Sequence, residues 1–116
     1  LGPINEIPGT VASEHIADTE FGEMTFDTHE FTQVGTRGTV LTRPESIDFG
    51  NQGASAVVDS IRFHGHNAIV TVITQSGLRL KVRDEQSVAT HIGDTVHLAF
   101  HGTNSFIPAG ETSERP

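Results

Sequence analysis

Short segments of alternating apolar and polar residues, separated by glycines, constrain the fold of this chain more than any other feature. Over residues 78–83, Leu and Val alternate with Arg and Lys, and residues 95–101 repeat the alternation. A period of two places successive side chains on opposite faces of a β-strand. Glycines such as Gly65, Gly77 and Gly93 separate these segments. Short strands with turn residues between them predict an all-β fold of antiparallel strands, a small sandwich or barrel.

Further segments are rich in residues that favour strands. Residues 68–74 are β-branched or small, with apolar side chains on both faces, as expected of a central strand covered on both sides. Strands are also expected at residues 7–12, 21–26, 38–41 and 56–63. Little helix is expected, because residues 84–91 have room for one helical turn before Gly93 and Asp94 turn the chain into the next strand.

Length and composition exclude several classes of protein. A chain of 116 residues, 34% of them apolar, is expected to bury a single core. The absence of cysteine excludes disulfides, a thiolate nucleophile and cysteine-ligated metals. Lys81, the one lysine, follows Leu80, so these residues cannot contain a phosphate-binding P-loop, which requires Gly-Lys. No nucleophile and base can be paired from the sequence, so no catalytic residue is assigned.

The acidic residues are concentrated in the first third of the chain. The net charge is -8, from 15 acidic and 7 basic residues, and residues 1–36 contain acids but no Lys or Arg. Nucleic-acid binding depends on clustered Lys and Arg, so nucleic acid is not an expected partner. The acidity is therefore a property of one flank rather than of the whole fold.

The histidines are the best candidates for chemistry, since the chain has 7 of them. His64 and His66 flank Gly65, and in an extended chain their Cβ atoms would lie roughly 6–7 Å apart, close enough to share a metal ion. We favour the interpretation that the histidines face solvent on strands and turns. No metal site is therefore assigned, and His64 and His66 are kept as candidates for a histidine-based metal sensor.

Short motifs follow one another in a characteristic order along the chain. They are Leu1-Gly2-Pro3-Ile4-Asn5, Leu41-Thr42-Arg43-Pro44-Glu45, Phe63-His64-Gly65 and Gly93-Asp94-Thr95-Val96. Together they resemble the TOBE regulatory domain, which lies at the C-terminus of ATP-binding subunits of bacterial ABC importers. The resemblance covers roughly residues 1–108, although residues 14–30 match it poorly and are more acidic than the family pattern.

The resemblance implies an OB-fold-like β-barrel without catalytic residues. Residues 1–6 would end a linker from a missing nucleotide-binding domain, 7–110 would form the barrel, and 111–116 a disordered tail. The chain starts at Leu1 without methionine, which agrees with a fragment. ATP and Mg would bind the missing domain, so no cofactor is expected here, and the full-length subunit would be an ABC-type ATPase.

The resemblance also implies partners and a location. The partners are a second copy, giving a homodimer, the membrane permease subunits, and a regulatory protein or small ligand. The complex would lie on the cytoplasmic face of the cell membrane. The cargo implied is iron(III), a polyamine or a sugar, and we favour iron(III).

The motif residues have local structural interpretations. Arg43 precedes Pro44 and is therefore expected to be extended, while Pro44 ends a strand, because it cannot donate a ladder hydrogen bond. Arg43 and Glu45 are candidates for an ion pair. Gly65 permits a positive φ or a close backbone approach at a tight connection. We favour a structural role over ligand contact for these residues and for Phe63, Gly93 and Asp94.

Two alternative functions remain open from the sequence. One is an oxyanion-binding module of the related molybdate-binding kind, which would use backbone N–H groups at a subunit interface. The net charge of -8 disfavours it. The other is the histidine-based metal sensor.

Overall fold

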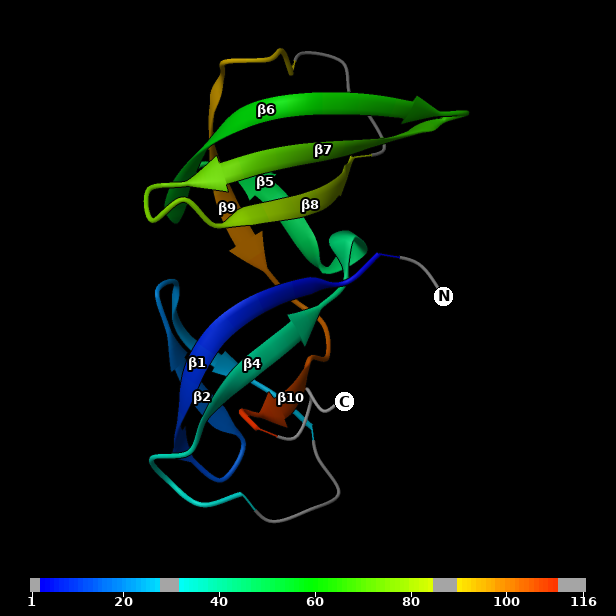
Figure 1. Cartoon of the computed structure of the whole chain (residues 1–116). Coiled ribbons are helices and arrows are strands. Elements are labelled where there is room, and N and C mark those ends of the chain that lie inside the picture. The colour runs from blue at the N-terminus through cyan, green and yellow to red at the C-terminus, as the bar shows by residue number, and fades with distance from the viewer. Residues whose placement is uncertain (1–2, 28–31, 85–89, 111–116) are drawn as a thin grey trace. The chain divides into compact units, whose positions relative to one another are not determined.

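The computed structural model describes residues 3–27, 32–84 and 90–110 (Figure 1). Nearly all regular structure in these residues is β-strand, so the predicted all-β fold with little helix is confirmed. The elements are β1 (Asn5–Ser13), β2 (Ile16–Thr19), β3 (Gly22–Thr25), β4 (Arg37–Thr42), the short 3-10 helix η1 (Pro44–Ser46), β5 (Ile47–Gly50), β6 (Ala54–His64), β7 (Asn67–Thr74), β8 (Arg79–Asp84), β9 (Thr95–Phe100) and β10 (Ser105–Pro108).

The chain forms two compact units, each with its own five-stranded antiparallel sheet. Unit 1 contains Arg43–Gly102 together with Pro3 and Ile4, and unit 2 contains Asn5–Thr42 and the chain from Thr103 onward. This differs from the single core expected from the chain length. The expected helical turn falls largely on residues 85–89, and the expected tail on residues 111–116, which lie outside the described residues.

The sheet of unit 1 has the strand order β5-β9-β6-β7-β8. In β8, Leu80 and Val82 are buried, whereas Arg79, Lys81 and Arg83 are exposed, as the alternation predicts. The sheet coils, so that β5 and β9 run across the direction of β6 to β8 (Figure 1). Its edge strands β5 and β8 approach each other, but no ladder of hydrogen bonds between described residues closes the sheet into a barrel.

A β-bulge in β6 is tied to the turn that precedes β9. Val58 pairs with Val72 and Ser60 with Thr71, so Asp59 is the extra residue of the bulge. The Gly93 N–H donates to the Val58 carbonyl at 2.8 Å, and the Val58 N–H donates to the Asp94 carbonyl at 2.9 Å. The predicted turn at Gly93 and Asp94 is thus confirmed, with a φ of 94° at Gly93.

The sheet of unit 2 has the order β10-β4-β1-β2-β3. Its core includes Ile7, Val40, Phe26 and Phe106, and the rings of Phe26 and Phe106 stack with centroids 5.0 Å apart. Since β10 follows β9 in the chain, unit 2 is completed only by residues that come after the whole of unit 1.

No helix in the described part of the chain is long and apolar enough to cross a membrane.

Candidate functional site

The Arg43-Pro44-Glu45 motif forms the step from β4 into η1. Arg43 has φ -89° and ψ 153°, so its predicted extended geometry is confirmed, and Pro44 is buried at the first position of η1. The Ser46 N–H donates to the Arg43 carbonyl at 2.9 Å, which closes the turn. No ion pair joins Arg43 to Glu45, nor either of them to another described residue.

The same turn is connected to the end of β9. The Ser46 carbonyl accepts a hydrogen bond from the His101 N–H at 2.9 Å. The His101 Nε2 also lies 3.0 Å from the Asp48 Oδ2, just after the turn. The residues that follow the motif therefore join the beginning of β5 to the end of β9.

The Phe63-His64-Gly65 motif forms the tip of the hairpin between β6 and β7. Gly65 has a φ of 59°, which confirms the predicted positive φ, and Gly65 with His66 makes the turn. Because the chain reverses here, the extended geometry assumed for a shared metal between His64 and His66 is wrong. Among the described residues, no group of three His, Asp or Glu side chains is arranged to hold a metal ion.

The two motifs meet around a cavity of about 320 Å³ in unit 1. The cavity is lined by Pro3, Arg43, Pro44, Glu45, His64, Asn67, Ile69 and Arg83. Sequence reasoning singled out the motif residues and missed Asn67, Ile69 and Arg83. The alternation in residues 78–83 placed Arg83 on an exposed face, but nothing local indicated what that face adjoins.

Strand pairing explains how these side chains come together. Ile69 on β7 lies opposite Arg62 on β6 and Arg83 on β8, and His64 lies opposite Asn67. Side chains of directly paired residues share a face of the sheet. The face that carries Ile69 therefore also carries the row of cations from β6 and β8.

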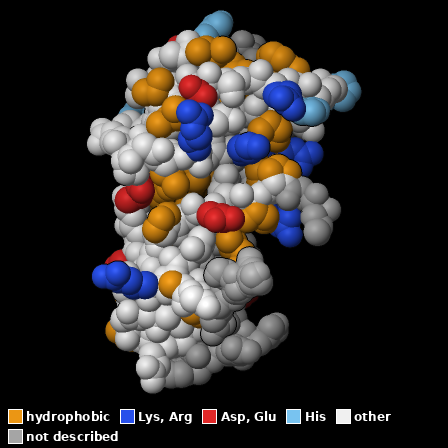
Figure 2. Space-filling model, in the orientation of Figure 1, with side chains coloured by type: hydrophobic (Ala, Val, Ile, Leu, Met, Phe, Trp, Pro, Cys, Tyr) orange, Lys and Arg blue, Asp and Glu red, His pale blue; other side chains and the backbone are white. Residues whose placement is uncertain are grey.

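Positive charge gathers on this face of unit 1. Figure 2 shows Lys and Arg side chains clustered over β6, β7 and β8. Arg79 is ion-paired, with its Nη1 2.9 Å from the Asp59 Oδ2. Arg43 and Arg83, which line the cavity, make no ion pair with a described residue.

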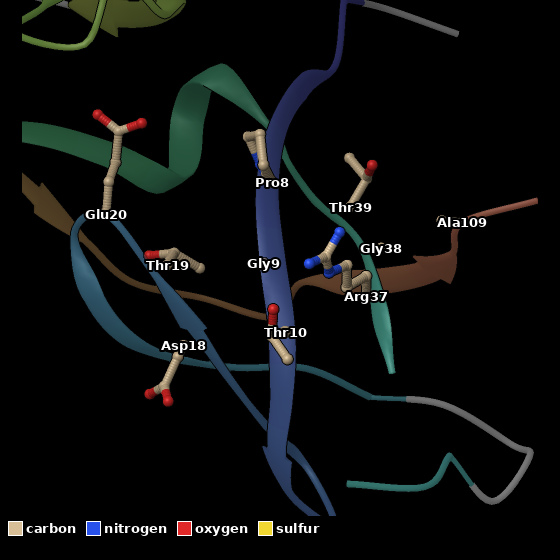
Figure 3. A pocket seen from close by; sticks show the side chains of 10 residues that line it. All are labelled: Pro8, Gly9, Thr10, Asp18, Thr19, Glu20, Arg37, Gly38, Thr39 and Ala109. Atoms are coloured by element: carbon tan, nitrogen blue, oxygen red, sulfur yellow. The ribbon is translucent and has the colours of Figure 1, made fainter. Parts of the chain in front are cut away.

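A second hollow, of about 450 Å³, lies within unit 2 (Figure 3). Gly9 and Gly38 are cross-strand partners in its floor, so two neighbouring positions lack side chains. Arg37 lies beside Thr39 on one side of β1, and the carboxylates of Asp18 and Glu20 lie on the other side, pointing away from each other. This hollow is open, and its charged groups do not converge on a common point.

The match to a family model decides the family. The model of the TOBE domain matches residues 40–106, more than half of the chain. The chain belongs to the TOBE family. No curated protein matched the chain.

The TOBE match includes the whole of Arg43–Gly102, and with it β5 to β9 and the cavity motifs. It leaves out most of β1 to β4 in unit 2, which contains the segment that also fits the family pattern poorly in sequence. A TOBE domain is itself non-catalytic, and such domains occur in ATP-binding subunits of ABC transporters and in related regulators.

Proposed function

We propose that this TOBE chain is the regulatory and dimerisation module of the ATP-binding subunit of an ABC importer. The observation that carries the proposal is the family match over residues 40–106, which contains the Arg43-Pro44-Glu45 motif. In this proposal the chain holds two copies of the subunit together, while ATP and Mg bind a separate nucleotide-binding domain. The complex works at the inner face of the cell membrane, with permease subunits as partners.

The cargo proposed is iron(III), a polyamine or a sugar, the classes that the family resemblance implies. Uptake of each labelled cargo by cells that express the complete transporter separates the three. Uptake of iron(III) alone would support our preference, whereas uptake of a polyamine or a sugar without iron(III) would contradict it.

The reading frame that encodes the chain gives the sharpest test of the subunit assignment. We expect the coding sequence upstream of Leu1 to contain a P-loop and an ABC signature segment. A DNA-binding domain upstream would instead assign the chain to a regulator, and would contradict the proposal.

The dimerisation part is tested on the chain itself. Size-exclusion chromatography with light scattering, over a range of concentrations, is expected to give a mass approaching twice 12.5 kDa as the concentration rises. Two exposed apolar side chains support contact with a second copy: Phe63, at the tip of the β6–β7 hairpin, is 66% exposed, and Ile92 is 67% exposed. A strictly monomeric chain at millimolar concentration would contradict dimerisation, but it would not contradict the assignment to an ATP-binding subunit.

A further inference from the structure

The cavity of unit 1 combines two guanidinium groups with an apolar wall. Arg43 reaches it from the step between β4 and η1, and Arg83 from β8. Pro44 and Ile69 supply apolar surface, while Asn67 and His64 add polar groups from the β6–β7 hairpin. With Pro3, which also lines the cavity, four separate segments of unit 1 converge on one hollow.

The charge of the cavity favours an anion. Arginine is always protonated, and its planar fork of donors matches a carboxylate or a phosphate with two parallel hydrogen bonds. Arg79, on the same sheet, is already ion-paired with Asp59 at 2.9 Å. Arg43 and Arg83 have no such partner among the described residues, so their donors are available to a bound anion.

Glu45 and the size of the cavity restrict the class of ligand that fits. Glu45 also lines the cavity, so the lining contains one carboxylate and two guanidinium groups, and its net charge is positive. The volume of about 320 Å³ lies at the small end of the range for ligand pockets. This is the volume that roughly ten water molecules occupy in the liquid, and a bare tetrahedral anion would leave part of it unfilled. The remaining space adjoins Pro44 and Ile69, which suits an apolar body.

We propose that this cavity binds a small organic anion, a molecule with a carboxylate or phosphate head and a compact apolar body. The head lies between Arg43 and Arg83, and the body contacts Pro44 and Ile69. Arg43 lies just before η1, and Arg83 lies on β8. Along the chain, β5, β6 and β7 separate these two residues, so the ligand joins parts of unit 1 that are far apart in sequence. Binding requires neither a second copy nor an ATPase domain.

Two aromatic anions serve as probes in a titration of the whole chain followed by amide NMR shifts. Phenyl phosphate and benzoate carry the two kinds of head on the same body, phenol is the neutral control, and inorganic phosphate lacks the body. We expect saturable shifts at Asn67, Ile69 and Arg83 with at least one aromatic anion, and none at Gly38 in the hollow of unit 2. Phenol is expected to cause no saturable shift, and inorganic phosphate to bind at least about tenfold more weakly than the better aromatic anion.

Variants locate the charge that binds the head. Arg43→Gln and Arg83→Gln are each expected to weaken binding of the better probe about tenfold or more, because each removes a charge-assisted pair of hydrogen bonds. Arg62→Gln is the matched control: Arg62 lies opposite Ile69 from the other side but does not line the cavity. It removes the same charge and is expected to change affinity less than about twofold. All three arginines are exposed, so thermal unfolding is expected to be nearly unchanged.

Several results would overturn the proposal. Saturable binding of neither aromatic anion would do so, as would an equal loss in Arg62→Gln, which would indicate a diffuse charge effect. Inorganic phosphate binding as tightly as phenyl phosphate would show that an apolar body adds no affinity, which contradicts the proposed ligand class. These outcomes are independent of light scattering and of the upstream reading frame, so this inference and the proposed function fail separately.

Discussion

At the scale of single residues, Gly38 shows why a glycine can be required without a positive φ. It lies in β4 between Gly9 on β1 and Pro108 on β10. A Cβ at this position would lie against the Ile107 carbonyl oxygen and 2.5 Å from the Phe106 Cζ. The requirement is therefore the close approach of β10 and a buried ring, which the local sequence does not reveal.

Gly38→Ala is expected to lower the free energy of unfolding by about 1–3 kcal/mol, because the backbone of β10 has to move. Gly50→Ala is the matched control, since a Cβ there would meet nothing closer than 3.9 Å. Its free energy of unfolding is expected to stay within about 0.5 kcal/mol of the parent. Urea denaturation followed by circular dichroism measures both, and equal losses would contradict the contact argument.

Substitution by valine is expected to affect stability differently at two buried threonines. Thr42 is 1% exposed and its Oγ1 has no hydrogen-bond partner among the described residues. The Thr74 Oγ1 accepts from the Leu78 N–H at 3.2 Å and lies 3.0 Å from the Ser76 Oγ. Because valine has the same shape without the hydroxyl, Thr42→Val is expected to leave stability unchanged or raise it by up to about 1 kcal/mol.

Thr74→Val is expected to lower stability by about 1 kcal/mol or more, because the Leu78 N–H loses its side-chain acceptor. Thermal and urea unfolding of the two variants under the same conditions gives the comparison. A larger loss in Thr42→Val than in Thr74→Val would show that the Thr42 hydroxyl has a partner that matters.

At the scale of elements, periodicity predicted the long strands, whereas pairing decided the short ones. β6, β7, β8 and β9 were expected within a few residues of their observed bounds, because β8 and β9 alternate apolar with polar residues, and β7 is rich in β-branched residues. β2, β5 and β10 are four residues each and were not predicted. A segment so short shows little alternation, and it becomes a strand because a partner supplies the ladder. For β5 that partner is β9, about fifty residues away.

The turn before β9 gives an element-scale prediction. The Asp94 Oδ2 accepts a hydrogen bond from the His91 N–H at 2.9 Å, while its backbone holds the bulge of β6. Asp94→Ala is expected to lower the free energy of unfolding by about 0.5–1.5 kcal/mol, because the exposed turn loses its side-chain acceptor. Asp94→Asn keeps an oxygen acceptor and is expected to lose less than half as much. Losses of equal size in urea denaturation would indicate that the charge, not the hydrogen bond, matters.

At the scale of the whole molecule, the acidity of the chain belongs to one unit. Unit 2 contains nine of the 15 acids and two of the 7 basic residues, whereas unit 1 is nearly balanced. The charge difference first read along the sequence is thus a difference between two folded units. Unit 1 itself contains six acids and five basic residues, so its cations are gathered on one face rather than in excess over its acids.

Chain connectivity predicts that the units differ in autonomy. Residues 43–102 contain every strand of the unit 1 sheet and nine of the buried apolar residues. Residues 1–42 lack β10 and Phe106, which stacks on Phe26. A fragment of residues 43–102 is therefore expected to fold, with dispersed amide NMR shifts and marginal stability for its size. A fragment of residues 1–42 is expected to remain unfolded, and a folded 1–42 fragment would contradict this.

The sequence by itself determined the all-β class, the long strands, the turns at Gly65 and Gly93, and the family resemblance that the match confirmed. These depend on local properties, namely alternation, backbone restriction at Pro44 and the conformational freedom of glycine. Only the tertiary structure decided that there are two sheets and that β10 completes the sheet of unit 2. It also decided that Arg83 and Ile69 join the motif residues around one cavity. The reason is that ladder hydrogen bonds and side-chain contacts between strands join residues far apart in sequence, so no local pattern records which strands pair.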